Sequence, residues 1–246
     1  MRAPVAVGWL TLAAVASCSK DKPDPREARV APNPSAAASA SSGQQQFVAF
    51  SGTATFLIDA PLEKIKGRSI EARGHLNVDP RDLKSTRGQI EFDLDDLKTE
   101  TFQDDAKNKA QTGHAKNWFE IGPDVDAQRR EENRWVRFTI RSIDQAGATE
   151  LAQVTKGSPV PVRATGDFWL HGVTSPKTVA ATVTFDGPPD APTSVHIVTT
   201  EPLTVSLKQH DVKPRDLAGK FLAGALDKIG QKIDDTVKIS LDLTAK

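Results

Sequence analysis

The stretch PVRATGDFWLHGVTSPKTVAATV, residues Pro161–Val183, carries the strongest structural signal in the chain. Its first half alternates Val162, Ala164, Gly166, Phe168 and Leu170 with Arg163, Thr165, Asp167, Trp169 and His171. This period of two is typical of a strand with one apolar and one polar face. The run breaks over Gly172–Pro176 and resumes through Val179, Ala181, Val183 and Phe185. We therefore expect an antiparallel hairpin whose apolar face needs a partner elsewhere in the chain.

Further strand patterns recur at short spacing on both sides of this hairpin. They cover Phe47–Ile58, Ile70–Val78, Ile90–Leu94, Val136–Ile140, a weaker run at Thr149–Val154, Val195–Val198, Leu203–Leu207 and Val237–Leu243. About nine or ten strands at this spacing favour an all-β fold closed into an antiparallel barrel, because closure removes exposed edge strands. A sandwich of two sheets is the alternative topology.

Two segments interrupt the strand pattern. Asp104–Phe119 contains helix-forming residues with Gly113 in the middle, which predicts a short helical insertion of one or two turns. In Leu217–Ile233 the apolar residues recur every three or four positions. That spacing predicts an amphipathic helix near the C-terminus, with Asp216 as its N-cap.

The composition excludes several classes of protein. Thirty-two Lys and Arg residues balance thirty-two Asp and Glu residues. No net field therefore draws the chain to nucleic acid, and we expect no nucleic-acid partner. The 38% of apolar residues is enough for a core but not for several membrane spans.

The N-terminal residues predict export and lipid anchoring. Residues 1–17 place Arg2 before a short apolar run, as in a secretory signal peptide. The sequence VASC at 15–18 fits a bacterial lipobox, in which Cys18 is acylated and becomes the mature N-terminus and membrane anchor. An incidental cysteine in a signal peptide is the alternative. Because Ser19 stands where Asp would favour inner-membrane retention, we expect a lipid-anchored protein of the cell envelope, in the outer membrane and facing the periplasm.

A tether is predicted between this anchor and the folded domain. Residues 18–46 are rich in Pro, Ala and Ser and contain almost nothing to bury, so they are expected to be disordered. The domain is expected to span residues 47–246. The sequence leaves the oligomeric state open, a homodimer included.

Three segments carry a resemblance to a known family. The strongest is ATGDFWLHGVTSPKTV at Ala164–Val179, a strand–turn–strand signature of the type Gly-x-Leu-x-Leu-x-Gly-x-Thr-x-Pro. The second is Thr99–Ile121, where a polar helical stretch leads to NWFEI. The third is the order of Thr55–Ile58, Gly67 and the strand that ends at Val78. Together these segments resemble the YceI-like family of periplasmic, lipocalin-like proteins, over roughly residues 47–246.

The resemblance implies a lipocalin-like β-barrel whose apolar lumen holds a long lipid, a polyisoprenoid or fatty-acid-like molecule, without catalysis. Trp118 and Phe119, at the end of the helical insertion, are expected to form a lid. The residues expected to line the lumen are apolar and lie on the alternating strand faces: Phe92, Leu94, Phe138, Ile140, Phe168, Leu170, Val179, Val183 and Phe185. The alternative is a filled barrel that acts as a surface-anchored structural or interaction module.

Signatures of enzymes and metal sites are missing from the sequence. There is no nucleophile elbow and no Gly-rich phosphate loop, and acylation of Cys18 would leave no thiol. The five histidines are too far apart in sequence for a metal motif, and His75 and His171 are expected at the surface. Asp95-Asp96 is expected to end a strand. We therefore expect no catalytic residue, no metal and no cofactor.

The densest polar cluster is HDVKPRD at His210–Asp216. A solvated loop before a helix is the expected structure. The functional alternatives are an ion-pair latch at the mouth of the barrel, a contact for an anionic head group, or the site of a hydrolase or metal-dependent enzyme.

Overall fold

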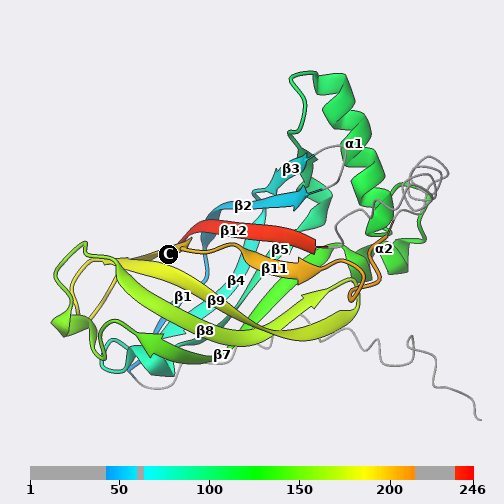
Figure 1. Cartoon of the computed structure of the whole chain (residues 1–246). Helices are drawn as coiled ribbons and strands as arrows, with labels where there is room; N and C mark the ends of the chain where they lie inside the picture. Colours follow the sequence, from blue (N-terminus) through cyan, green and yellow to red (C-terminus); the bar gives the residue numbers. More distant parts are fainter. Residues whose placement is uncertain (1–42, 60–63, 214–235) are drawn as a thin grey trace, which may run out of the picture. The chain divides into compact units, whose positions relative to one another are not determined.

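The computed structural model describes residues 43–59, 64–213 and 236–246, in which twelve strands form one antiparallel sheet (Figure 1). The strands are β1 (Gln45–Phe47), β2 (Phe50–Asp59), β3 (Lys64–Ser69), β4 (Ala72–Val78), β5 (Arg87–Asp93), β6 (Lys98–Thr99), β7 (Trp135–Ala146), β8 (Val160–Leu170), β9 (Val173–Asp186), β10 (Ser194–Thr199), β11 (Leu203–Ser206) and β12 (Thr236–Ala245). The helices are α1 (Asp105–Trp118), α2 (Ala127–Asn133) and three 3-10 helices, η1 (Leu83–Ser85), η2 (Leu94–Asp96) and η3 (Leu151–Gln153). None of these helices is long and apolar enough to cross a membrane.

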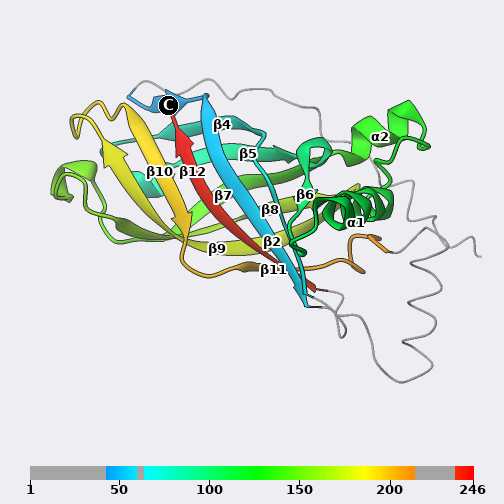
Figure 2. The same ribbon diagram turned by 90° about the horizontal axis from the view of Figure 1, so that it is seen from above.

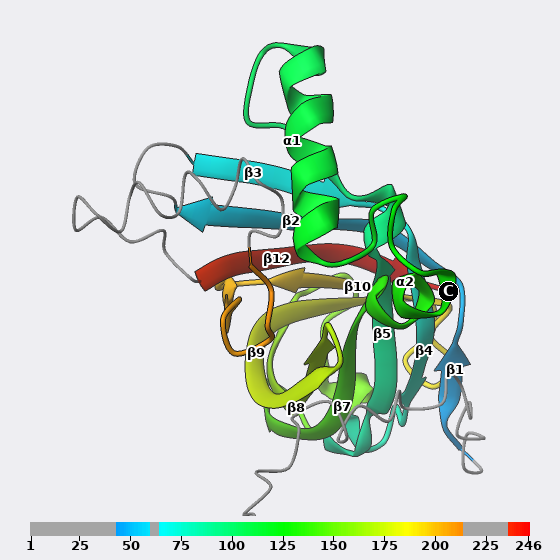
Figure 3. The ribbon, with the colours of Figure 1, turned by 90° about the vertical axis from the view of Figure 1, so that its right-hand side faces the viewer.

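The sheet curls into a barrel that its bent N-terminal strand closes (Figures 2 and 3). The strand order is β1-β4-β5-β7-β8-β9-β10-β12-β2-β3-β6, and β11 pairs with β12. β1 pairs with β4, whereas β2, after a bend at Val48-Ala49, pairs with β12. At the bend the N–H groups of Val48 and Ala49 both donate to the carbonyl of Lys246, at 3.0 and 2.9 Å. The all-β, lipocalin-like barrel is therefore confirmed, and the two-sheet sandwich is wrong.

The central hairpin is confirmed, but its turn is shorter than expected. β8 and β9 pair from Val160 opposite Val183 to Leu170 opposite Val173, which leaves only His171 and Gly172 in the turn. Both turn residues have positive φ, at 50° and 78°, as a two-residue turn between right-twisted strands requires. The expected break over Gly172–Pro176 is therefore wrong beyond Gly172. Pro176 fits inside β9 because β10 pairs with β9 only from Ala181 onward.

Most of the other predicted strands are present, with three differences. Phe47–Ile58 divides into β1 and β2 at the bend that closes the barrel. Thr149–Val154 is not a strand, since it contains η3, whose Leu151 is buried and donates its N–H to the carbonyl of Pro80. Ile70, expected in a strand, lies between β3 and β4 and is 47% exposed.

The helical insertion is longer than expected. α1 runs for 14 residues because Asp104 caps it, accepting from the N–H groups of Ala106 and Lys107 at 2.8 and 3.1 Å. Its middle is bound to β6, where the Thr99 hydroxyl donates to the Asn108 carbonyl at 2.8 Å. α2 was not expected from the sequence. The predicted helix Leu217–Ile233 lies outside the described residues.

Candidate ligand-binding cavity

A cavity of about 230 Å³ lies within the curled sheet. All nine residues expected to line the lumen do line it: Phe92, Leu94, Phe138, Ile140, Phe168, Leu170, Val179, Val183 and Phe185. They come from β5, η2, β7, β8 and β9, whose alternation turns one side chain in two toward the interior. Whether these side chains touch a ligand stays a prediction.

Sequence reasoning missed the lining residues of the strands that close the barrel. Ala54, Phe56 and Ile58 line the cavity from β2, Val195 and Ile197 from β10, and Leu241 from β12. The same period-two signal marks these strands. What it could not supply was the register between β2 and β12, which pairs Ala54 with Leu241 across 187 positions of sequence.

The cavity wall is almost entirely apolar. Among the described lining residues the polar ones are Thr55, Ser69, Thr86, Gln111, His114, Arg137 and Thr199, and none is a carboxylate. A polar chamber would be needed to hold ordered water with hydrogen-bond partners, whereas an apolar cavity of about 150 Å³ stays dry and admits apolar molecules. The wall therefore suits an apolar guest and offers little to a polar one.

Arg137 is charged, but its charge is compensated on the outer side of the wall. Its guanidinium bonds to the carboxylate of Glu91, and both side chains are buried. Arg73 reaches the same carboxylate at 2.5 Å and stacks on the ring of Trp135, 3.3 Å from its centroid. Trp169, expected on a polar face, lies 5.2 Å from the Arg137 guanidinium and is 5% exposed. This charge thus stabilises the wall and presents no free cation to the lumen.

One end of α1 lies at the rim of one end of the barrel (Figure 3). Trp118 and Phe119 both line the cavity, together with Ala115 one turn earlier. Ile121, which follows directly, is 1% exposed and belongs to the same apolar cluster as Phe168 and Leu170. The two aromatic residues are placed as the predicted lid requires, although their action as a lid stays a prediction.

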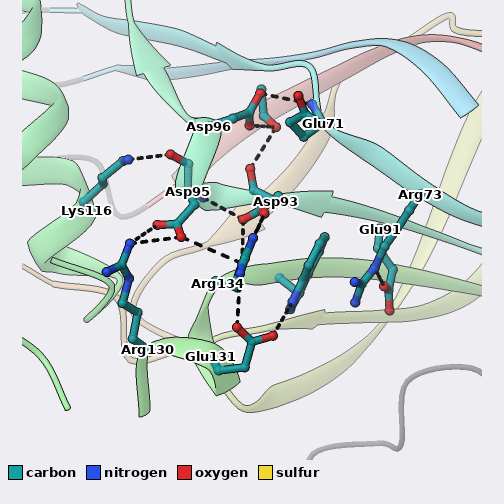
Figure 4. Close-up of polar contacts among 12 residues, drawn as sticks. Glu71, Arg73, Glu91, Asp93, Asp95, Asp96, Lys116, Arg130, Glu131 and Arg134 are labelled. Atoms are coloured by element: carbon teal, nitrogen blue, oxygen red, sulfur yellow. Dashed lines mark hydrogen bonds and ion pairs between the residues drawn. The ribbon is translucent and has the colours of Figure 1, made fainter. Parts of the chain in front are cut away.

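Ion pairs hold α2, and a hydrogen bond holds α1, to the barrel wall beside this lid (Figure 4). Arg134, just after α2, donates from Nε to both carboxylate oxygens of Asp93, at 3.0 and 3.1 Å, and this hydrogen bonding raises the pKa of Arg134. Arg130 reaches both oxygens of Asp95 at 2.9 and 3.0 Å, and Lys116 of α1 donates to the carbonyl of Asp95 at 2.5 Å. Both α1 and α2 are therefore attached to the barrel at the end of β5.

Asp95-Asp96 ends the strand as expected, within η2. The Asp96 carboxylate accepts from the N–H groups of Ile70 and Glu71, at 2.7 and 3.0 Å. Both carboxylates are thus used to organise the chain around the end of β5. This arrangement favours a structural role for the pair.

A buried polar network lies at the same end of the barrel. His171 is completely buried, so the expectation that it lies at the surface is wrong. Its Nε2 is 3.0 Å from Glu120 Oε2, and its Nδ1 is 3.1 Å from the carbonyl of His210. Arg129 of α2 donates to the same Glu120 oxygen from Nε and Nη2, at 2.9 and 2.6 Å. The network therefore joins α1, α2, the β8–β9 turn and the loop after β11.

His210 is also completely buried, so the expectation of a solvated loop is wrong at this residue. Its Nδ1 lies 3.1 Å from the Leu170 carbonyl and its Nε2 lies 3.2 Å from Ser175 Oγ. Burial lowers the pKa of His210, which favours a neutral ring that donates from Nδ1 and accepts at Nε2. The ring also packs edge-on against Phe168, with centroids 5.5 Å apart.

The rest of the predicted His210–Asp216 cluster does not converge on His210. Asp211 pairs with Lys213 at 2.6 Å, and both side chains are exposed. The remaining residues of this cluster, 214–216, lie outside the described part of the chain. His75 is half-buried on β4. Across the described ranges, no three His, Cys, Asp or Glu side chains gather as a metal site would require.

Comparisons with known proteins agree with this architecture. The model of the YceI-like domain family matches residues 39–245. The crystal structure of BcnA from Burkholderia cenocepacia shares 15% identity with a TM-score of 0.50, over 79% of this chain and 96% of that one. A polyisoprenoid-binding domain from Saccharophagus degradans, implicated in plant cell wall breakdown, shares 13% identity with a TM-score of 0.51, over 82% of this chain and 98% of that one.

The two solved structures support the fold alone, since their identities are low. No curated protein sequence matches the chain. The family match extends over most of the 246 residues, from just before β1 to the last strand. The chain therefore belongs to the YceI-like domain family.

Proposed function

We propose that this protein binds a long apolar molecule, an isoprenoid or a fatty-acid-like lipid, in the lumen of its barrel and does not catalyse a reaction. The observation that carries the proposal is the 230 Å³ cavity with its almost wholly apolar wall. Transfer of apolar surface out of water contributes about 25 cal/mol per Å², so a flexible hydrocarbon chain is the guest that such a wall stabilises most. The polyisoprenoid-binding name of one structural neighbour points to the same class of ligand.

A filled barrel that serves only as a structural module is the second candidate. It would need side chains to occupy the interior, as in small barrels without ligands. The cavity favours the carrier over this candidate, because lining positions such as Ala164 and Ala181 hold small residues where large ones would fill the space.

A hydrolase site at His210 is not favoured. Ser175 donates to the neutral His210 ring, but the group that orients the ring is the carbonyl of Leu170 and not a carboxylate. Asp211 is engaged with Lys213. Ser175 is 2% exposed and is not among the described residues that line the cavity, so a lipid ester in the lumen would not reach its hydroxyl.

The location that we propose follows from the sequence. A signal peptide at residues 1–17, acylation of Cys18 and a tether up to residue 46 would hold the barrel at the outer membrane, facing the periplasm. Labelling with a radioactive or alkyne-bearing fatty acid tests the anchor. Wild-type chain is expected to take up label, and Cys18→Ser is expected to take up none.

Lipid extraction tests the ligand. The full chain carrying Cys18→Ser removes the protein's own acyl groups, so any long-chain lipid recovered must have been bound. Organic extraction followed by mass spectrometry is expected to recover an isoprenoid or a long acyl lipid, at up to one molecule per chain. Recovery of no lipid, together with failure to bind added isoprenoids and fatty acids, would contradict the proposal.

A further inference from the structure

Two residues that meet through their side chains both have a left-handed backbone. Glu120 has φ 55° and His171 has φ 50°. Such a conformation costs a non-glycine residue free energy, and residues that keep it cluster at ligand clamps and switch regions. Local backbone geometry therefore does not explain why a Glu and a His stand at these two positions.

Each residue stands where glycine or asparagine is usual. Glu120 follows α1 at the position where a glycine commonly ends a helix, and the N–H groups of Glu120 and Ile121 bond back to the carbonyls of Asn117 and Lys116, at 3.1 and 3.0 Å. His171 is the first residue of the two-residue β8–β9 turn, a position that favours asparagine or glycine. In both places a charged or polar side chain replaces the residue that the backbone prefers.

The contact between the two side chains is an ion pair. Glu120 is held as a carboxylate by two hydrogen bonds from Arg129. The second acceptor at the His171 ring is the carbonyl of His210. Because a carboxylate and a carbonyl only accept, both nitrogens of His171 must donate, and the bonded ring is an imidazolium. A charge-assisted bond at 3.0 Å to a fully buried ring is stronger than a neutral one.

Other charged groups lie on the elements next to this pair, and their own contacts are as follows. Arg129 comes from α2 and Lys177 from β9, where it donates to the carbonyl of Thr204 at 3.3 Å. The loop after β11 supplies the neutral His210 and the pair of Asp211 and Lys213. The carboxylate at the His171 ring comes from Glu120.

The ion pair connects the lid to the barrel. Glu120 is the residue after Phe119, and His171 belongs to the hairpin whose Phe168 and Leu170 line the cavity. α1 is also attached through Thr99 of β6, which bonds to Asn108 and Thr112 at 2.8 and 2.9 Å. Near its C-terminal end Lys116 donates to the carbonyl of Asp95 at 2.5 Å. α1 is thus held to β6 and to the end of β5, and Glu120, which follows it, is held to the β8–β9 turn.

We propose that the ion pair between Glu120 and His171 is a latch that holds the aromatic lid closed and limits the rate at which lipid leaves the lumen. This inference rests on the lipid-binding function proposed above. Breaking the latch frees the segment after Lys116, which holds Trp118 and Phe119, while α1 stays attached to β5 and β6. The affinity of the lumen itself changes little, because neither Glu120 nor His171 lines it.

Three variants and one control separate the latch from simple loss of structure. Glu120→Gln removes the charge, and Glu120→Gly removes the side chain while giving the backbone the residue that it prefers. His171→Asn suits the turn but lacks the second donor that reaches Glu120. The control is Asp242→Asn, which breaks the other described His–carboxylate contact, between His196 and Asp242 at 2.7 Å on the outer wall.

The test measures lipid release in the full chain carrying Cys18→Ser, loaded with a pyrene-labelled sixteen-carbon lipid and mixed with excess phosphatidylcholine vesicles. The latch predicts that each of the three variants releases the probe about tenfold faster or more, since a hydrogen bond between charged groups is lost. Asp242→Asn is expected to release it at the wild-type rate. Unchanged release in Glu120→Gly and His171→Asn would overturn the latch.

Amide hydrogen exchange supplies a readout that needs no ligand. In the lipid-free chain the latch predicts faster exchange over residues 115–121 in the three variants, with the strands β8 and β9 unchanged. Equal exchange in all variants would overturn the latch even if lipid binds. Failure of the wild-type chain to bind any lipid would instead overturn the proposed function, so the two failures are distinguishable.

Discussion

Ala181 of β9 lies opposite Val162 of β8, and both side chains line the cavity. Small residues at this point of the central hairpin keep the lumen open, because a larger side chain on an inward-facing position would occupy the space of the guest. Ala180, the next residue along β9, lies opposite Arg163 and is not among the described lining residues.

Filling the lumen is expected to weaken lipid binding without unfolding the barrel. Ala181→Phe places a ring in the cavity, so bound lipid is expected to fall about tenfold, with a stability change within the roughly 1–3 kcal/mol typical of overpacking. Ala180→Phe is the matched control and is expected to retain lipid, since its ring points outward. Lipid recovered per chain, quantified by mass spectrometry, checks both. Equal loss in the two variants would place the ligand elsewhere.

The buried pair of Glu91 and Arg137 is expected to show strong coupling. Arg137→Met leaves the Glu91 carboxylate buried with Arg73 as its remaining cationic partner and a hydrogen bond from Gln89, so the free energy of unfolding should fall by about 3 kcal/mol. The double variant Glu91→Met/Arg137→Met should recover most of that loss, because an apolar pair has no desolvation penalty. Urea denaturation of the two single variants and the double variant checks this. Additive losses would mean that the pair is not coupled.

Gly74 on β4 is expected to be irreplaceable. Its φ is 144°, and a Cβ there would collide with the carbonyl oxygen of Gln89 on β5. Gly74→Ala should therefore lower the free energy of unfolding by about 1–3 kcal/mol. Gly113→Ala is the control, because a Cβ at that position of α1 would meet nothing within 4 Å. It should gain about 0.5–1 kcal/mol from better helix propensity. A harmless Gly74→Ala would show that β4 lies farther from β5 at this point.

His210 is expected to contribute a loss of stability in mild acid. Burial lowers the pKa of His210 in the folded chain, below the value of 6.5 that applies when it is unfolded. Below about pH 6.5 the unfolded chain binds a proton at His210 that the folded chain does not bind. The contribution of His210 to stability is therefore fully present above about pH 6.5 and is lost as the pH falls through the folded pKa. His210→Gln should flatten this part of the profile while lowering stability overall. An unchanged slope between about pH 7.5 and 5 would contradict the assignment.

The sequence was most informative where a period of two could be read directly from neighbouring residues. Phe168, Leu170, Val179 and Val183 line the cavity as the alternation of the hairpin predicted. Successive side chains of a strand point to opposite faces whatever the strand pairs with, so the face of each residue can be read from its neighbours in sequence. The pairing of β2 with the distant strand β12 cannot be read from neighbouring residues. The sequence therefore did not show that these two strands contribute to the cavity wall.

The polar end of the barrel could not be predicted for a related reason. His171 and His210 are far apart in sequence. His171 precedes Gly172 at the end of a strand pattern and His210 lies between Gln209 and Asp211, which is typical of exposed turns. Their burial depends on tertiary partners, the carboxylate of Glu120 and the carbonyl groups of Leu170 and His210. Glu120 carried one local signal, since it follows an aromatic pair at the end of a helical stretch, but nothing in the sequence indicated that His171 faces it.

The central claim, that a lipid occupies the lumen, is tested most directly by photocrosslinking. The full chain carrying Cys18→Ser is loaded with a long-chain lipid that bears a diazirine near the end of its tail, irradiated, digested and sequenced by mass spectrometry. On the central hairpin we predict labels on the inward positions Phe168, Leu170, Val179 and Val183, and their loss in Ala181→Phe. Labels on the alternate, outward positions such as Thr178 and Ala180 would contradict the account.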